Sequence, residues 1–254
     1  MDTRFWGPSG WKLLHLTCTT ADRPRLNDFL ETIPYILPCL FCRASLTDYY
    51  RQHPYTTAKD MSRWIYQIHN LVNAKLRKQG LHPAPNPTYA TAKAHVADLM
   101  AAPWSVQLTG FWDFLFAVGY HHPKHAILTK PMENCPPHAV SGSVCEQNKW
   151  NVLPYHERMK WFHRFWSILP DVLPPEIQKR WRTALVVCPL DDSSRRSTMA
   201  WLWRMRCHID ADFHDPYLSV CKRVGAFSSD CGTTRGAITC RRKHRKRHTR
   251  KRTS

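Results

Sequence analysis

The sequence has few glycines, few acidic residues and no long apolar run. No two of its nine glycines are separated by a single residue, which excludes the Gly-x-Gly turn that holds a dinucleotide in Rossmann folds. No apolar run follows Met1, so we expect no secretory signal peptide. The best candidate for a membrane span, residues 104–120, carries Gln107 and Asp113 and is too short to cross a bilayer comfortably. These absences predict a soluble protein.

Cysteine is plentiful, but a secreted disulfide scaffold is not predicted. Such scaffolds are short chains with regular cysteine spacings, whereas this chain has 254 residues and ten irregularly spaced cysteines. A hydrophobic content of 43%, with eleven tryptophans, predicts a buried core in one large or two small domains.

Positive charge is concentrated at the carboxyl end of the sequence. The formal net charge is +18, and residues 241–252 hold nine of the lysines and arginines. Such a run repels itself and cannot bury apolar surface, so we expect it to stay disordered until it meets a polyanion such as nucleic acid. The alternative is a solubilising tail without a partner.

Cys39 and Cys42, directly after Pro38, form the one Cys-x-x-Cys pair. Two thiols at this spacing can close a disulfide across one helical turn, and Pro38 favours a helix start here, with the helix running through Tyr50. The positive end of a helix stabilises a thiolate on Cys39, so the pair is a candidate redox centre. Two alternatives stay open: a zinc half-site in a structural protein that binds nucleic acid, and a pair of inert buried thiols.

Hydrophobic spacing predicts an all-α fold in the first hundred residues. We expect the first helix to start at Pro8 and Ser9, where start signals stand. Four further helices are expected over residues 25–36, 38–50, 57–78 (or from Lys59) and 88–101.

Three motifs follow one another along these helices. They are Trp-Gly-x-x-x-Trp-x-x-Leu-His at residues 6–15, Pro-Cys-x-x-Cys at residues 38–42 and His-Asn-x-Val-Asn-x-Lys-Leu at residues 69–76. In this order and at these spacings they resemble the Erv/ALR family of FAD-linked sulfhydryl oxidases. The resemblance covers residues 4–100 and implies a four-helix bundle with a short fifth helix and FAD in its mouth. By the same resemblance, the residues that line FAD are Trp11, His15, His69, Asn70, Val72, Asn73, Lys75 and Tyr89.

The resemblance also implies a reaction. A dithiol of a protein substrate attacks Cys39, the exposed member of the pair, and the second substrate thiol resolves the mixed disulfide. Cys42 then passes two electrons to FAD, and molecular oxygen reoxidises the flavin to give hydrogen peroxide. No metal is expected, and a homodimer is compatible with this interpretation.

The sequence departs from the family pattern at several positions. Leu37 stands where a tyrosine often precedes the first cysteine, and Pro8 stands where an arginine is common. Tyr66 replaces the structural cysteine that cellular members carry three residues before His69. These departures are typical of a divergent member, and viral members are the ones we expect to look like this, with a location in the host cytoplasm or the virion.

The second half of the sequence echoes the first. The segment 33–38 is matched by the segment 169–174, and each ends in Leu-Pro. Trp64 follows Pro38 by 26 residues, and Trp201 follows Pro174 by 27. We therefore predict a degenerate helical copy without a redox pair, in which residues 124–153 are an inserted loop. The predicted division is a catalytic domain at 1–103, a pseudo-domain at 104–226 and a basic tail at 227–254. Chance similarity between two amphipathic helical arrays is the alternative.

Oxidases of this family usually relay electrons through a second, mobile cysteine pair. Cys231 and Cys240 flank a segment without apolar periodicity, so they are the best candidates for such a shuttle. Cys135 and Cys145, in the inserted loop, are the second choice. Incidental thiols are the alternative for both pairs.

Overall fold

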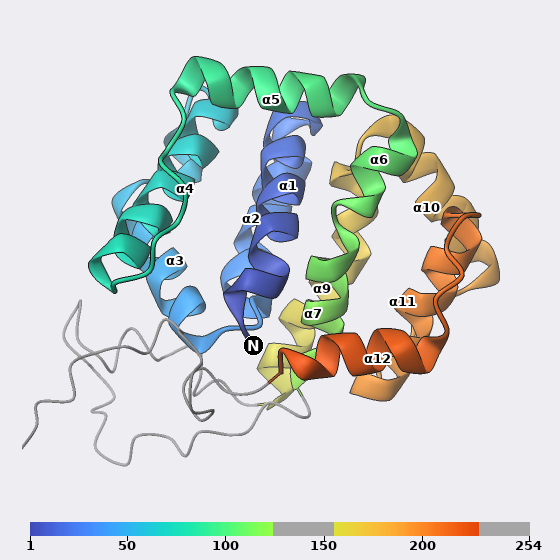
Figure 1. Ribbon diagram of the computed structural model, residues 1–254. Helices are drawn as coiled ribbons and strands as arrows, with labels where there is room; N and C mark the ends of the chain where they lie inside the picture. Colours follow the sequence, from blue (N-terminus) through green and yellow to red (C-terminus); the bar gives the residue numbers. More distant parts are fainter. Residues whose placement is uncertain (124–154, 229–254) are drawn as a thin grey trace, which may run out of the picture.

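A computed structural model describes residues 1–123 and 155–228, and within these ranges every regular element is helical, as predicted (Figure 1). The inserted loop, the basic tail and both candidate shuttle pairs lie outside the described residues. The first half comprises α1 (Thr3–Thr20), α2 (Arg23–Ile36), α3 (Leu40–Gln52), the 3₁₀ helix η1 (Tyr55–Thr57), α4 (Met61–Lys78) and α5 (Tyr89–Ala101). The second half comprises α6 (Trp104–Thr109), α7 (Trp112–Tyr120), α9 (Tyr155–Val172), α10 (Pro175–Val187), α11 (Arg195–Ile209) and α12 (Tyr217–Ala226).

Two helices begin at positions other than those predicted, because aspartate caps decide where they start. The Asp2 carboxylate accepts the Arg4 amide at 2.9 Å, so α1 begins at Thr3 and Pro8 lies inside it. The Asp60 carboxylate accepts the Arg63 amide at 2.9 Å, so α4 begins at Met61, after the short η1. In both cases a side-chain oxygen satisfies an amide that has no partner within the helix.

The first half is a four-helix bundle. The helix α1 packs on α4, α2 packs on α3, and α3 closes the bundle against α4. The helix α5 lies across one end, next to α1 and α4 (Figure 1). None of the described helices is long and apolar enough to cross a membrane.

The second half repeats this arrangement. The helix α7 packs on α11, α9 packs on α10, α10 packs on α11, and α12 lies across the opposite end of the molecule (Figure 1). Trp64 and Trp201, at matching places in the two halves, also make the same kind of hydrogen bond. The Trp64 Nε1 donates to the His53 carbonyl after α3 at 2.9 Å, and the Trp201 Nε1 donates to the Cys188 carbonyl after α10 at 3.1 Å.

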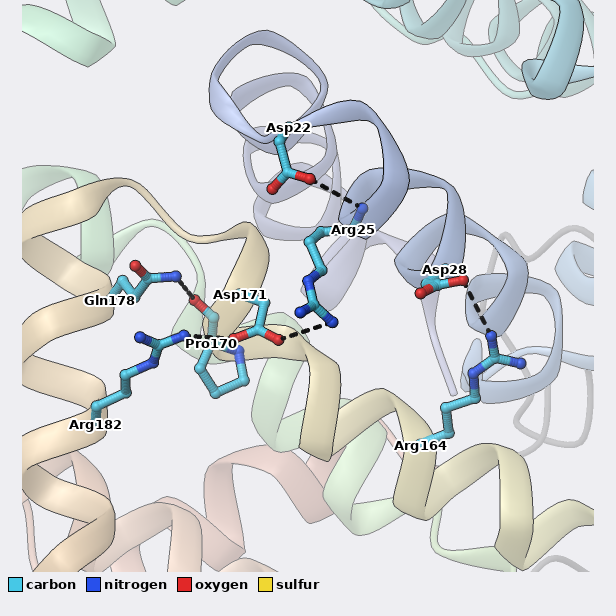
Figure 2. Close-up of polar contacts among 8 residues, drawn as sticks. All are labelled: Asp22, Arg25, Asp28, Arg164, Pro170, Asp171, Gln178 and Arg182. Atoms are coloured by element: carbon cyan, nitrogen blue, oxygen red, sulfur yellow. Dashed lines mark hydrogen bonds and ion pairs between the residues drawn. The ribbon is translucent and has the colours of Figure 1, made fainter.

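The two halves meet mainly where α2 packs on α9. When Pro38 is aligned with Pro174, Phe165 is the counterpart of Phe29, and these two rings stack with centroids 5.7 Å apart. On the same alignment, Arg164 is the counterpart of Asp28, and these residues form an ion pair at 3.3 Å (Figure 2). When residues at equivalent positions of the two halves contact each other, they lie next to a local two-fold axis that relates the halves.

Two contacts further from this axis are reciprocal. Arg25 pairs with Asp171 at 3.8 Å (Figure 2), and Tyr35 stacks on Trp161 with ring centroids 4.0 Å apart. Trp161 is the counterpart of Arg25, and Asp171 is the counterpart of Tyr35. The same two positions therefore meet twice, as in a self-complementary dimer interface, although their side chains differ between the halves.

The buried apolar residues of both halves belong to one continuous cluster. It passes through α2 and α9, and also through α1 and α7, where a Cβ on Gly10 would lie 3.1 Å from the Phe114 ring. Because the two halves share one core, we expect them to unfold together rather than as separate domains.

This shared core predicts the effect of a substitution at its centre. Phe165 is fully buried, so Phe165→Ala should lower the free energy of unfolding by about 3–5 kcal/mol. Urea denaturation followed by far-UV circular dichroism measures this and should show a single transition. As a control, Val186→Ala alters a side chain that is 83% exposed and should change the value by no more than about 0.5 kcal/mol. Two separate transitions would contradict a shared core.

Candidate functional site

The two cysteines lie at the amino end of α3. Cys39 is the N-cap residue of this helix, and its Sγ accepts the Cys42 amide at 3.3 Å. The Cys39 carbonyl also accepts the amides of Cys42 and Arg43, at 3.1 and 3.0 Å. The predicted helix start after Pro38 is confirmed. A sulfur at this position faces the positive end of the helix dipole, which favours a thiolate.

The prediction that Cys39 is the exposed member of the pair is wrong for this structure. Cys39 is 2% exposed, whereas Cys42, one turn into the helix, is half-buried. The N-cap geometry explains the difference, because it turns the Cys39 side chain back over the first turn of α3 to meet the Cys42 amide.

The structure brings together three of the predicted cofactor residues, from α1 and α4. The Trp11 indole stacks on the His69 imidazole, with centroids 4.0 Å apart and planes 11° from parallel. The His15 Nε2 and His69 Nδ1 lie 3.1 Å apart, at hydrogen-bond distance. Burial lowers the pKa of each histidine to about 4. Both rings are therefore neutral at pH 7, and one nitrogen of the pair donates while the other accepts.

A hollow that is open to solvent lies beside this cluster, between α1, α4 and α5. His15, Thr19, Ser62, Tyr66, Tyr89 and Lys93 are among the residues that line it. Thr19, Ser62 and Lys93 were not predicted from the sequence, although Thr19 lies one helical turn beyond His15 and the same spacing could have revealed it.

The remaining predicted residues lie along α4, outside the lining of this hollow. The Asn73 amide donates to the Asn86 side chain at 2.9 Å, and Lys75 donates to the Ser45 hydroxyl on α3. Asn70 and Val72 are half-buried on the same helix. The Lys75 contact ties the helix that carries the cysteines to the helix that carries His69.

Tyr89 reaches the hollow from the first turn of α5 and contacts Tyr66. The two ring centroids are 5.3 Å apart, and the Tyr66 hydroxyl donates to the Pro87 carbonyl at 2.8 Å. The Tyr89 hydroxyl in turn donates to the Asp60 carboxylate at 3.0 Å. Tyr66, which stands at the position of the family's structural cysteine, thus fastens the start of α5 to α4 by noncovalent contacts.

The chemistry of these residues suits a flat aromatic cofactor with an anionic tail. The neutral histidines and Trp11 offer stacking faces and ring hydrogen bonds. Lys93 at the hollow supplies positive charge for phosphate groups.

The corresponding turn of the second half has no cysteine pair. Pro175 and Gln178 stand at the counterparts of the two cysteines, and the Gln178 amide donates to the Pro170 carbonyl at 2.8 Å (Figure 2). A neutral side-chain hydrogen bond therefore closes this turn. Within the part of the chain that the structure describes, no group of three or more metal-binding side chains is present.

Comparison with known proteins places the similarity in the first half. Residues 8–90 match the model of the Erv1/Alr family, which confirms the resemblance inferred from the motifs. The chain is 29% identical over 85 residues to a probable FAD-linked sulfhydryl oxidase, R368, of Acanthamoeba polyphaga mimivirus. It is 30% identical over 86 residues to the mitochondrial FAD-linked sulfhydryl oxidase ERV1 of Saccharomyces cerevisiae. It is 28% identical over 92 residues to a putative FAD-linked sulfhydryl oxidase, 096R, of invertebrate iridescent virus 3.

These matches are partial on both sides. They cover 29%, 30% and 32% of this chain, and 59%, 46% and 62% of the respective relatives. The chain therefore spans about half of the length of the curated relatives it matches. No solved structure shows a significant match to the chain.

The neutral histidine pair predicts a loss of stability in acid. In the unfolded chain a histidine titrates near pH 6.5, and in the fold His15 and His69 titrate near 4. Between these values the unfolded state binds more protons, so the free energy of unfolding should fall as the pH drops from about 6.5 to 4. Urea denaturation at several pH values across this range should show that the free energy of unfolding depends less steeply on pH in His69→Gln than in the parent protein. The exposed His95 on α5 is the matched control, and an equal effect of His95→Gln would contradict the assignment.

The contact between Tyr66 and the segment before α5 predicts a graded loss of stability in two Tyr66 variants. Tyr66→Phe removes the hydrogen bond to Pro87 and should cost about 0.5–1.5 kcal/mol of unfolding free energy. Tyr66→Ala also removes the contact with the Tyr89 ring and should cost more. Tyr155→Phe alters a tyrosine that is 43% exposed and serves as the control. Equal stability of all three variants and the parent would show that these contacts do not fasten α5.

Proposed function

We propose that this chain, whose residues 8–90 match the model of the Erv1/Alr family, is a thiol oxidase that uses FAD to form disulfides in protein substrates. The observation that carries the proposal is the placement of Cys39 and Cys42 at the amino end of α3. Lys75 joins this helix to α4, which presents His69 beside Trp11 and His15. A redox-competent cysteine pair and a site for an aromatic cofactor thus share one bundle.

The residues at and beside the hollow, and those further along α4, have separate tasks in this proposal. Trp11 and His69, already stacked on each other, give the cofactor an aromatic surface. Lys93 and Tyr89 would hold its polar groups from α5, while Asn73 and Lys75 act from α4. FAD held there would supply an acceptor for two electrons from the cysteine pair, and its reoxidation by oxygen would give hydrogen peroxide.

The cysteine pair exchanges with substrate by ordinary thiol chemistry. A substrate thiolate attacks one sulfur of the Cys39–Cys42 disulfide, a mixed disulfide forms, and the second substrate thiol releases it. The resemblance gives the attacked position to Cys39. Because Cys39 is only 2% exposed, attack at this sulfur requires the first turn of α3 to open. The helix end stabilises the sulfur that leaves as a thiolate.

We further propose that residues 104–226 are a degenerate copy of the catalytic half. The same order of helix contacts, the two tryptophan hydrogen bonds and the paired counterparts across α2 and α9 support this division. With Pro175 and Gln178 at the cysteine positions, the copy performs no exchange of its own. Its contribution is structural, since it covers one face of the catalytic bundle.

The zinc half-site with a nucleic-acid-binding tail is the competing function, and a purified sample distinguishes the two. The oxidase is yellow and contains flavin, whereas the competing protein contains zinc and no flavin. The basic segment 241–252 stays a predicted polyanion-binding segment under either function.

The proposal predicts the behaviour of cysteine variants. Cys39→Ser and Cys42→Ser should each reduce oxygen consumption with a small dithiol to the background rate while flavin stays bound. The matched control is Cys221→Ser, which alters a half-buried cysteine on α12 and should retain the parent rate. Full activity in Cys42→Ser would contradict the proposed electron path.

A further inference from the structure

Arg43, the residue after Cys42, has an unusual position for an arginine. Its side chain is buried, with the residue only 5% exposed. The Arg43 Nε donates to the Leu37 carbonyl at 2.7 Å, and its backbone amide donates to the Cys39 carbonyl at 3.0 Å. The side chain therefore folds back along the turn that carries both cysteines.

Burial of a guanidinium is costly unless anionic or strongly polar groups compensate it. Burial lowers the pKa of Arg43 to about 10, and the charges of Cys39 and Cys42 act in the opposite direction. This opposition means that a thiolate at either sulfur stabilises the buried cation. By reciprocity, the cation stabilises the thiolate.

The second half provides an internal comparison. The turn after α9 has the same helix–turn–helix arrangement as the turn after α2, but Pro175 and Gln178 replace the cysteines. At the counterpart of Arg43 stands Lys179, which is exposed. The turn is closed instead by the neutral hydrogen bond from Gln178 to the Pro170 carbonyl (Figure 2). Of these two turns, only the one with cysteines has a buried cation, so the fold of the turn does not itself require one.

Other elements also place ionisable groups around Arg43. Arg158 of α9 is 7% exposed and donates to the Pro123 carbonyl at 3.0 Å, and its charge reaches Arg43. The Met1 amino group donates to the Pro38 carbonyl at 2.9 Å. His121 has a pKa well below its usual range, first because of burial and then because of Arg43 and neighbouring cations. These groups add positive potential or stay neutral.

We propose that Arg43 is a positioning residue that stabilises the thiolate form of the Cys39–Cys42 pair. The guanidinium acts through the sulfur atoms rather than on the substrate. By favouring the reduced pair, it makes the disulfide a stronger oxidant of substrate thiols. This inference rests on the proposed redox role of the pair, but its test measures thiol acidity and needs no turnover.

The experiment compares Arg43→Gln, Arg43→Lys and the parent as purified full-length proteins with any bound cofactor retained. Each is reduced, and the rate of iodoacetamide alkylation at Cys39 and Cys42 is followed against pH by peptide mass spectrometry. In Arg43→Gln, the pH at the midpoint of the alkylation profile of the more acidic thiol should rise by about 1 pH unit or more. At pH values below both midpoints, this shift lowers the alkylation rate about tenfold. Arg43→Lys keeps the charge, so its midpoint should lie between those of Arg43→Gln and the parent.

Two controls separate charge from structure. Lys179→Gln makes the same kind of change at the counterpart position and should leave the midpoint unchanged, and far-UV circular dichroism checks that each variant is folded. An unchanged midpoint in folded Arg43→Gln overturns the inference. A parent midpoint at or above the ordinary cysteine value of about 8.5 also overturns it, whichever variants fold. A lowered parent midpoint in a protein without oxidase activity would instead refute the proposed function and leave the role of Arg43 intact.

Discussion

The packing of α2 on α9 is the constraint from which the rest of the structure follows. The helix α2 runs directly into the turn that carries Cys39, so the orientation of α2 fixes where the amino end of α3 begins. Phe29 and Phe165 stack across this contact, and Asp28 and Arg164 pair beside them. Apolar and charged contacts thus both join corresponding positions of the two halves, and together they hold α2 against the second half.

The two halves share some contacts and differ in others. In each half a tryptophan donates a hydrogen bond to the carbonyl just after an earlier helix of the same half. Only the first half combines the cysteine turn, the buried Arg43 and the stacked pair of Trp11 and His69. The features shared by the two halves are therefore those of the bundle, and the features that differ are those to which we assign the proposed redox chemistry.

The sequence predicted most of the helices and the place of the cysteine pair, because these depend on local signals. Pro38 marked the start of α3, and the stripe around His69 marked α4. The burial of Cys39 could not be predicted in this way, because it depends on how the N-cap side chain turns and on what packs over it. The starts of α1 and α4 were misplaced because the caps at Asp2 and Asp60 override the proline and threonine signals nearby.

Contacts between residues far apart in the sequence could not be predicted from local sequence patterns. The echo of Leu-Pro and Trp landmarks indicated a repeated half, but it gave no sign that Arg25 and Tyr35 would each meet the counterpart of the other. The burial of Arg43 was likewise hidden, since an arginine after a cysteine motif is most often solvated. Both depend on tertiary packing, which helix periodicity does not specify.

In the proposed reaction, electrons pass from a dithiol through Cys39 and Cys42 to bound FAD. Anaerobic addition of dithiothreitol to the purified protein, followed by visible absorbance, tests it most directly. The account predicts that the absorbance of oxidised flavin is lost in the parent protein, persists in Cys42→Ser, and returns in the parent when air is admitted. Flavin that stays oxidised after the cysteine pair has been reduced, or a purified protein with no flavin, would contradict it.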